Sequence, residues 1–165
     1  MILRIVKIIL VLSVALWGLA GAVLNFVNWD DTVRSVFVAT SMTSFEGGAE
    51  RFQATENPLL IWAGVLFIVA SKISVAVLCG LGAWKMWNAR RGDSKAFSAA
   101  KQLALAGCGI ALIMLFGGFI VVAETWFEMW RDPGLRSAAL ETASRYGAMI
   151  TLIALFVGMR DEERL

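Results

Sequence analysis

The sequence contains no histidine and only two cysteines in 165 residues. Without histidine, the chain cannot form histidine-ligated haem, histidine-based metal sites or a histidine general base. Two isolated cysteines, Cys79 and Cys108, cannot alone form a four-thiolate zinc or iron–sulfur site. No carboxylate pair stands out for acid–base chemistry, and no glycine spacing fits a phosphate-binding loop. We therefore expect no catalytic, metal-binding or cofactor-binding residues, no cofactor and no conventional enzyme.

Charged residues are also scarce. They make up 17% of the chain, whereas hydrophobic residues make up 59% and the mean hydropathy is +0.73. Soluble domains carry about 25% charged and about 45–50% apolar residues. This excess of apolar residues predicts a protein that lies in a lipid bilayer.

The apolar residues fall into four blocks. A helix of about 20 residues crosses the hydrocarbon core of a bilayer, and continuous apolar runs favour helices over barrel strands, which alternate in polarity. The fourth block is the shortest, because Arg145 limits how early its helix can start. We predict an all-α membrane protein with one domain over residues 1–165 and four transmembrane helices, at about 6–28, 58–86, 101–125 and 143–160.

The N-terminal segment resembles a signal peptide. Arg4 and Lys7 precede an apolar run, and Ala20, Gly21 and Ala22 match a small-residue cleavage pattern. The apolar run continues past the usual h-region of about 7–15 residues. We therefore expect the segment to be retained as the first transmembrane helix.

Basic residues gather on one side of the predicted bundle, and short loops rich in Lys and Arg stay in the cytoplasm. This predicts an N-in/C-in protein whose basic inner face suits anionic lipid headgroups and not nucleic acid. The residues assigned to that face are Arg4, Lys7, Lys85, Arg90, Arg91, Lys95, Lys101, Arg160 and Arg164. The other two connections hold no lysine and more carboxylates than arginines.

The outer connection, residues 29–57, is too long for a simple turn. Val33, Val36 and Phe37 would share one helical face after two aspartates that favour a helix start. Gly47 and Gly48 then allow a sharp reversal of the chain. We expect an ordered extracytoplasmic loop with short helical structure that lies across the outer end of the bundle.

Lys72 lies near the middle of the second apolar block, where a charge costs several kcal/mol unless it is paired or hydrated. One interpretation places Lys72 in an ion, proton or anionic-ligand site. The other makes it a structural lysine that binds backbone carbonyls or extends toward the membrane surface. Glu124 is the candidate counter-ion, but it lies about nine residues nearer the outer face, or roughly 13 Å along the helix axis. If Glu124 does not pair with Lys72, two other roles remain: it contacts Arg145, or it lies at a solvated helix end.

Cys79 and Cys108 are predicted to lie at similar heights in the membrane. The favoured interpretation is that both are small packing residues. A redox pair is the alternative, and it requires neighbouring helices with Cα atoms within about 7 Å.

Two segments resemble a known family. They are Thr40-Ser41-Met42-Thr43-Ser44-Phe45 with the later Arg51, and Glu124-Thr125-Trp126-Phe127-Glu128-Met129-Trp130. Over nearly the whole chain, the sequence resembles a bacterial family of small integral membrane proteins of unknown function. The resemblance implies a bacterial inner membrane location and no known activity. Our candidate residues for interactions at the outer cap are Met42, Phe45, Arg51, Trp126 and Trp130.

Three functional hypotheses follow. The first is a non-catalytic accessory or scaffold subunit that binds another integral membrane protein or a second copy of itself. The second is a small ion or solute transporter or channel with Lys72 in the pathway. The third is a lipid- or quinone-binding protein that uses the tryptophan-rich outer rim. In each case membrane lipids surround the protein.

Overall fold

The computed structural model describes residues 1–161, and these residues form helices without strands. Four helical segments are long and apolar enough to cross a membrane. The first is α1 (Ile2–Val27) and the second is α3 (Pro58–Ala89). The third joins α4 (Ser94–Ala100), α5 (Gln102–Leu112) and η1 (Ile113–Trp126). The fourth joins α6 (Pro133–Leu135), η3 (Arg136–Leu140) and α7 (Glu141–Gly158). The predicted all-α fold with four spans is confirmed.

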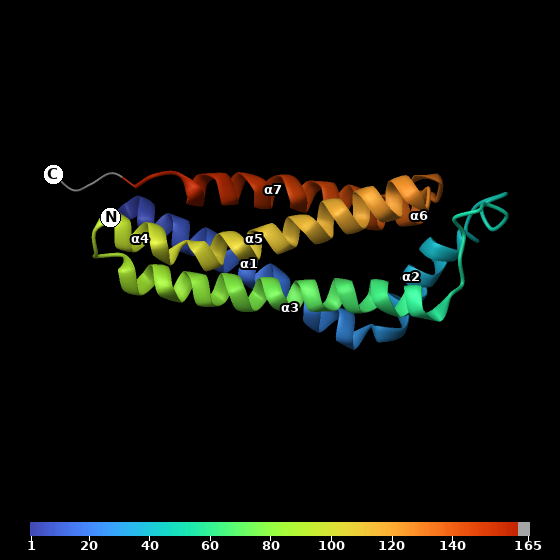
Figure 1. The fold of residues 1–165 in the computed structure, drawn as a ribbon, viewed down its shortest axis with the longest axis horizontal. Coiled ribbons are helices and arrows are strands. Elements are labelled where there is room, and N and C mark those ends of the chain that lie inside the picture. The colour runs from blue at the N-terminus through green and yellow to red at the C-terminus, as the bar shows by residue number, and fades with distance from the viewer. Residues whose placement is uncertain (162–165) are drawn as a thin grey trace.

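The bundle has two distinct ends (Figure 1). We call the end that holds Met1, the 90–93 turn and Asp161 the terminal end. The opposite end, which we call the loop end, holds the connection 28–57 and the turn 127–132. The outer connection contains α2 (Trp29–Ser41), which confirms the predicted short helix, and η2 (Met129–Arg131) lies in the turn after the third span.

The fourth helical segment begins at Pro133 rather than near residue 143. The Asp132 carboxylate accepts hydrogen bonds from the backbone N–H groups of Gly134 and Leu135, at 2.8 and 3.0 Å. Proline suits the first position of a helix, because its fixed φ matches the helix and its missing N–H costs nothing there. Arg145 therefore lies well inside a helix, where its side chain is exposed and its guanidinium carbon lies 5.5 Å from the centre of the Tyr146 ring.

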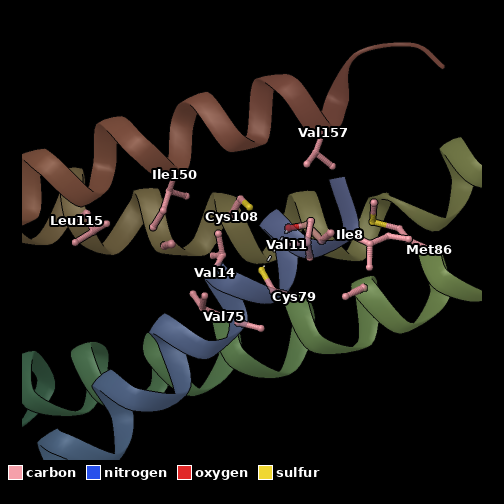
Figure 2. Packing of buried hydrophobic residues seen from close by; sticks show 14 of the residues in the cluster. Ile8, Val11, Val14, Val75, Cys79, Met86, Cys108, Leu115, Ile150 and Val157 are labelled. Carbon is pink, nitrogen blue, oxygen red and sulfur yellow. Dashed lines mark hydrogen bonds between the residues drawn. The ribbon is translucent and has the colours of Figure 1, made fainter. Parts of the chain in front are cut away.

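Helix α3 lies at the centre of the fold and packs against both α1 and α5. Glycine permits these close contacts: a Cβ on Gly82 would lie 2.5 Å from the backbone nitrogen of Ala104, and one on Gly18 would lie 2.9 Å from the carbonyl oxygen of Lys72. The apolar core fills the space between the helices, mainly toward the terminal half of the bundle (Figure 2). Its members include Val11, Val14, Val75, Cys79, Cys108, Leu115, Ile150 and Val157.

Tryptophans on α3 indicate the depth of each residue in a bilayer. Trp62 and Trp84 are both exposed and lie 22 residues apart, or about 33 Å at the helical rise of about 1.5 Å per residue. That separation matches a hydrocarbon core of about 30 Å bounded by aromatic belts. Lys72 lies ten residues from Trp62 and twelve from Trp84, close to the centre of the bilayer.

Candidate functional site

Lys72 contacts polar groups of α1. Its Nζ donates a hydrogen bond to Oδ1 of Asn25 at 2.6 Å and lies 3.5 Å from the carbonyl oxygen of Gly21. The absent side chain of Gly21 makes room for this contact, since a Cβ there would lie 3.1–3.4 Å from the last atoms of the lysine. Lys72 is half-buried. The structure therefore gives the membrane lysine a neutral partner and a backbone carbonyl.

The candidate counter-ion Glu124 does not contact Lys72. Within residues 1–161, the Glu124 side chain makes no ion pair and no hydrogen bond, and the residue is half-buried near the end of η1. The Arg145 guanidinium contacts the Tyr146 ring, and within residues 1–161 it does not pair with Glu124. The three intramembrane candidates are therefore not brought together.

The loop end contains a polar cluster centred on Glu128. The Glu128 carboxylate lies 3.1 Å from Arg131 and 3.8 Å from Arg51, and it accepts a hydrogen bond from the Gln53 side chain at 3.4 Å. The Arg131 guanidinium lies over the Phe45 ring, 4.6 Å from its centre. We call Phe45, Arg51, Gln53, Glu128 and Arg131 the loop-end platform. It joins the two segments on which the sequence resemblance rests.

The backbone of this region has unusual conformations. Met42, fully buried, ends α2 with φ 54°, and Glu128 has φ 49°. Gly48 lies so close to Met42 that a Cβ would lie 2.1 Å from the Met42 carbonyl oxygen. Non-glycine residues rarely adopt positive φ, and such residues concentrate at functional sites. This loop is therefore ordered by specific contacts.

The helix that precedes the loop-end platform is wound more widely than an α-helix. η1 is a π-helix, in which the N–H of Phe127 bonds to the carbonyl of Val122 at 3.1 Å, five residues earlier. The Thr125 hydroxyl likewise donates to the carbonyl of Ile120 at 3.0 Å. π-helical turns are rare and often occur at functional sites. The π-helical winding continues to the residue before the 127–132 turn.

Asp132 fixes the end of this turn. Hydrogen bonds from the Leu135 N–H, the Ser44 hydroxyl and the Gly134 N–H outweigh the effect of burial and hold the pKa of Asp132 below its usual value. The contact with Ser44 is a second link between the two segments. Asp132 thus stays ionised while it caps the fourth helical segment.

Three aromatic side chains project from the loop end. Phe52, Trp126 and Trp130 are 88%, 52% and 52% exposed. The rings of Phe52 and Trp126 meet edge to face, with their centres 5.8 Å apart. Of the predicted outer-cap residues, Trp126 and Trp130 are therefore exposed, Phe45 and Arg51 belong to the platform, and Met42 is buried beneath it.

A second polar cluster at the terminal end was not predicted. Lys7 of α1 pairs with Asp161 at 3.0 Å, Lys101 pairs with the other oxygen of the same carboxylate, and both lysines donate to the Met159 carbonyl at 2.9 Å. The side chains of Lys7, Lys101 and Asp161 are 4%, 3% and 6% exposed. Burial alone would raise the pKa of Asp161, but the two lysines outweigh it and hold the pKa below its ordinary value.

In the sequence, Lys7 and Lys101 indicate only the topology, and no pattern points to Asp161. The sequence held one indication of this cluster. Lys101 lies at the edge of an apolar block, where a lysine is usually paired with another polar group. Arg4 is buried beside this cluster, donates to the carbonyls of Arg90 and Gly92 at 3.1 and 2.6 Å, and lies over the Phe97 ring. The terminal end is therefore held by buried basic side chains.

The two cysteines are free and buried. Figure 2 shows Cys79 on α3 and Cys108 on α5, and the Cys79 thiol donates a hydrogen bond to the carbonyl of Ala104 at 3.6 Å. Cys79 fits against Gly107, at which a Cβ would lie 2.5 Å from its sulfur. The prediction that both cysteines are buried is confirmed, and the helices that carry them, α3 and α5, are neighbours.

The fold defines the class: this is an α-helical integral membrane protein with four spans. The chain belongs to the family of predicted small integral membrane proteins (DUF2165), whose model matches residues 3–160. Comparison with curated proteins gave no match, and neither did comparison with solved structures.

Proposed function

We propose that the protein is a non-catalytic accessory or scaffold subunit that binds another integral membrane protein through its loop end. The observation that carries this proposal is the exposed aromatic pair of Phe52 and Trp126 on an ordered support. Interface hot spots are enriched in aromatic side chains, and an ordered surface loses little entropy when it binds. The Glu128 ion pairs supply that order, because they connect two segments far apart in the sequence.

The proposal is tested with the full-length tagged protein in several mild detergents. We expect a defined assembly larger than the chain alone. The double variant Phe52→Ala/Trp126→Ala should release the partner, whereas Trp84→Ala, an exposed tryptophan at the terminal end, should not. A monomer under every gentle condition, or an assembly that the double variant leaves intact, contradicts the proposal. An assembly that contains only this chain identifies a second copy as the occupant.

Lys72 supports a second candidate function, a small ion or solute transporter or channel. A lysine near the bilayer centre with a neutral hydrogen-bond partner is the kind of residue found on membrane transport pathways. Proteoliposomes of the wild type should then pass small ions, and Lys72→Met should change the rate or selectivity. Equal flux through wild-type, Lys72→Met and protein-free liposomes excludes this candidate.

We further propose a bacterial inner membrane location with both termini in the cytoplasm. All lysines except Lys72 lie at or near the terminal end, as the retention of lysine-rich segments in the cytoplasm requires. In a background without the native cysteines, an impermeant maleimide added to intact cells should label Glu46→Cys and spare Lys95→Cys. The opposite labelling pattern reverses the topology.

A further inference from the structure

A groove of about 480 Å³ lies between α2 and the first turns of α3. Its volume falls within the range of small-molecule sites, about 300–1,000 Å³. One face of α2 and one of α3 form the walls, and most of the lining is apolar. The lining residues are Trp29, Asp30, Val33, Arg34, Phe37, Pro58, Ile61 and Trp62.

The groove lies at the level of the lipid headgroups. Helix α2 lies against the loop end of α3 (Figure 1). The contacts between the two helices include the Trp29 ring, 6.1 Å from the Trp62 ring, and Val36 against Gly64. Trp62 marks the aromatic belt on α3, so the contact between α2 and α3 lies at the level of the membrane interface. A ligand in this groove therefore meets both headgroups and acyl chains.

Two opposite charges line the groove. Asp30 and Arg34 are one helical turn apart on α2, a spacing at which such side chains often pair. Both side chains are exposed, and within residues 1–161 neither makes an ion pair or a hydrogen bond through its side chain. One cation and one anion are thus available above an apolar, aromatic floor.

We propose that this groove binds a phospholipid whose headgroup carries both a phosphate and a primary amine, as phosphoethanolamine does. Arg34 binds the phosphate, since guanidinium groups hold phosphate oxygens through two parallel hydrogen bonds. Asp30 accepts hydrogen bonds from the ammonium group. The Trp29 and Trp62 rings contact the start of the acyl chains, and the chains continue down the lipid-facing side of α3, where Leu66 is 57% exposed.

Charge complementarity selects this occupant over other lipids. An anionic phosphoglycerol headgroup satisfies Arg34, but its neutral glycerol offers Asp30 only uncharged hydroxyl donors, which leave the carboxylate without a cation. A phosphocholine headgroup has the same charges, but its quaternary ammonium cannot donate a hydrogen bond to Asp30. The predicted order of affinity is phosphoethanolamine first, with phosphocholine and phosphoglycerol both weaker.

The experiment is native mass spectrometry of the full-length, delipidated protein, titrated with phosphoethanolamine, phosphocholine and phosphoglycerol lipids of identical acyl chains. We expect one tightly bound phosphoethanolamine lipid, with about tenfold higher affinity than the other two lipids. A difference of this size is what the loss of one charge-assisted hydrogen bond would cause. Arg34→Gln should weaken all three lipids by about tenfold. Asp30→Asn should remove the preference for phosphoethanolamine and leave phosphoglycerol binding unchanged or stronger.

Matched controls at the terminal end are Arg91→Gln and Trp84→Leu, which change an exposed arginine and an exposed tryptophan outside the groove. They should bind all three lipids as the wild type does, and circular dichroism should confirm the helix content of every variant. The proposal is overturned if the wild type shows no preference among the lipids. It is equally overturned if Asp30→Asn and Arg34→Gln bind as the wild type does, or if a protein helix and no lipid fills the groove in a purified assembly.

Discussion

Lys72 and Asn25 form a 2.6 Å hydrogen bond between α3 and α1, on the loop-end side of the Lys72 backbone. Leaving a buried polar group without its partner costs about 1–3 kcal/mol. Asn25→Leu should therefore lower the free energy of unfolding in detergent micelles by about that amount. Asn88→Leu, at an exposed position of α3, is the control and should have little effect. In a double-mutant cycle, Lys72→Met should cancel most of the cost of Asn25→Leu; strictly additive effects would contradict the pairing.

Close contact between α3 and α5 gives a second prediction. Gly82→Ala places a Cβ 2.5 Å from the backbone of Ala104, which cannot move aside as a flexible side chain can. Overpacking of this kind costs about 1–3 kcal/mol, and we expect a loss of that size in chemical unfolding.

The control for Gly82 stands two residues away on the same helix. A Cβ on Gly80 meets nothing within 4 Å, so Gly80→Ala should stabilise the helix by up to about 1 kcal/mol. Equal effects of the two substitutions would show that α3 and α5 do not approach at Gly82.

Asp161 should stabilise the terminal end through Lys7 and Lys101. Hydrogen bonds to charged groups are worth about 1.5–3 kcal/mol, so Asp161→Asn should lower the free energy of unfolding by roughly this amount near pH 7. Glu46→Gln, an exposed carboxylate that makes no ion pair within residues 1–161, is the control.

The pH dependence of this effect has a definite sign. Because the pKa of Asp161 in the folded state lies below its ordinary value of 3.8, the contribution is complete above about pH 5. It decreases as the pH falls below about 4 and through the folded pKa, where protonation removes the charge. The stability difference between wild type and Asp161→Asn should shrink over that interval. A difference that grows on acidification would contradict the assignment.

Glu128 should hold the outer connection on the bundle. Glu128→Gln removes the charge that attracts Arg51 and Arg131, so the loop that carries Arg51 should open more often. We expect trypsin to cut at Arg51 several-fold faster and amide exchange over residues 42–57 to increase. Glu124→Gln is the matched control, since the Glu124 side chain makes no ion pair or hydrogen bond within the described part of the chain. Unchanged proteolysis in Glu128→Gln would show that the platform is not what holds this loop.

Much of the fold was predictable because the relevant signals are local. Continuous apolar runs identified the four spans, and the apolar face of residues 33–37 identified a helix in the outer connection. The helix that carries the fourth span begins at Pro133, ten residues before the predicted span start at 143, because Asp132 and Pro133 start it. Both capping residues were visible in the sequence.

The candidate site was less predictable. The sequence singled out Lys72, Arg51 and the aromatic residues of the loop end, and the depth estimate correctly argued against a direct Lys72–Glu124 pair. The partner that Lys72 does contact, Asn25, is neutral and was not considered. Glu128 pairs with Arg51 and Arg131, and the sequence assigned it no partner.

Composition and hydropathy by themselves determined that this chain lies in a membrane as four helices, because burial of apolar groups in lipid depends on runs of neighbouring residues. Only the tertiary structure decided which polar groups meet: Lys72 with Asn25, Lys7 and Lys101 with Asp161, and Glu128 with Arg51. Those pairings depend on how each helix is rotated about its axis and how closely glycines let neighbours approach. Such properties arise from contacts between segments far apart in the chain, which no local sequence pattern specifies.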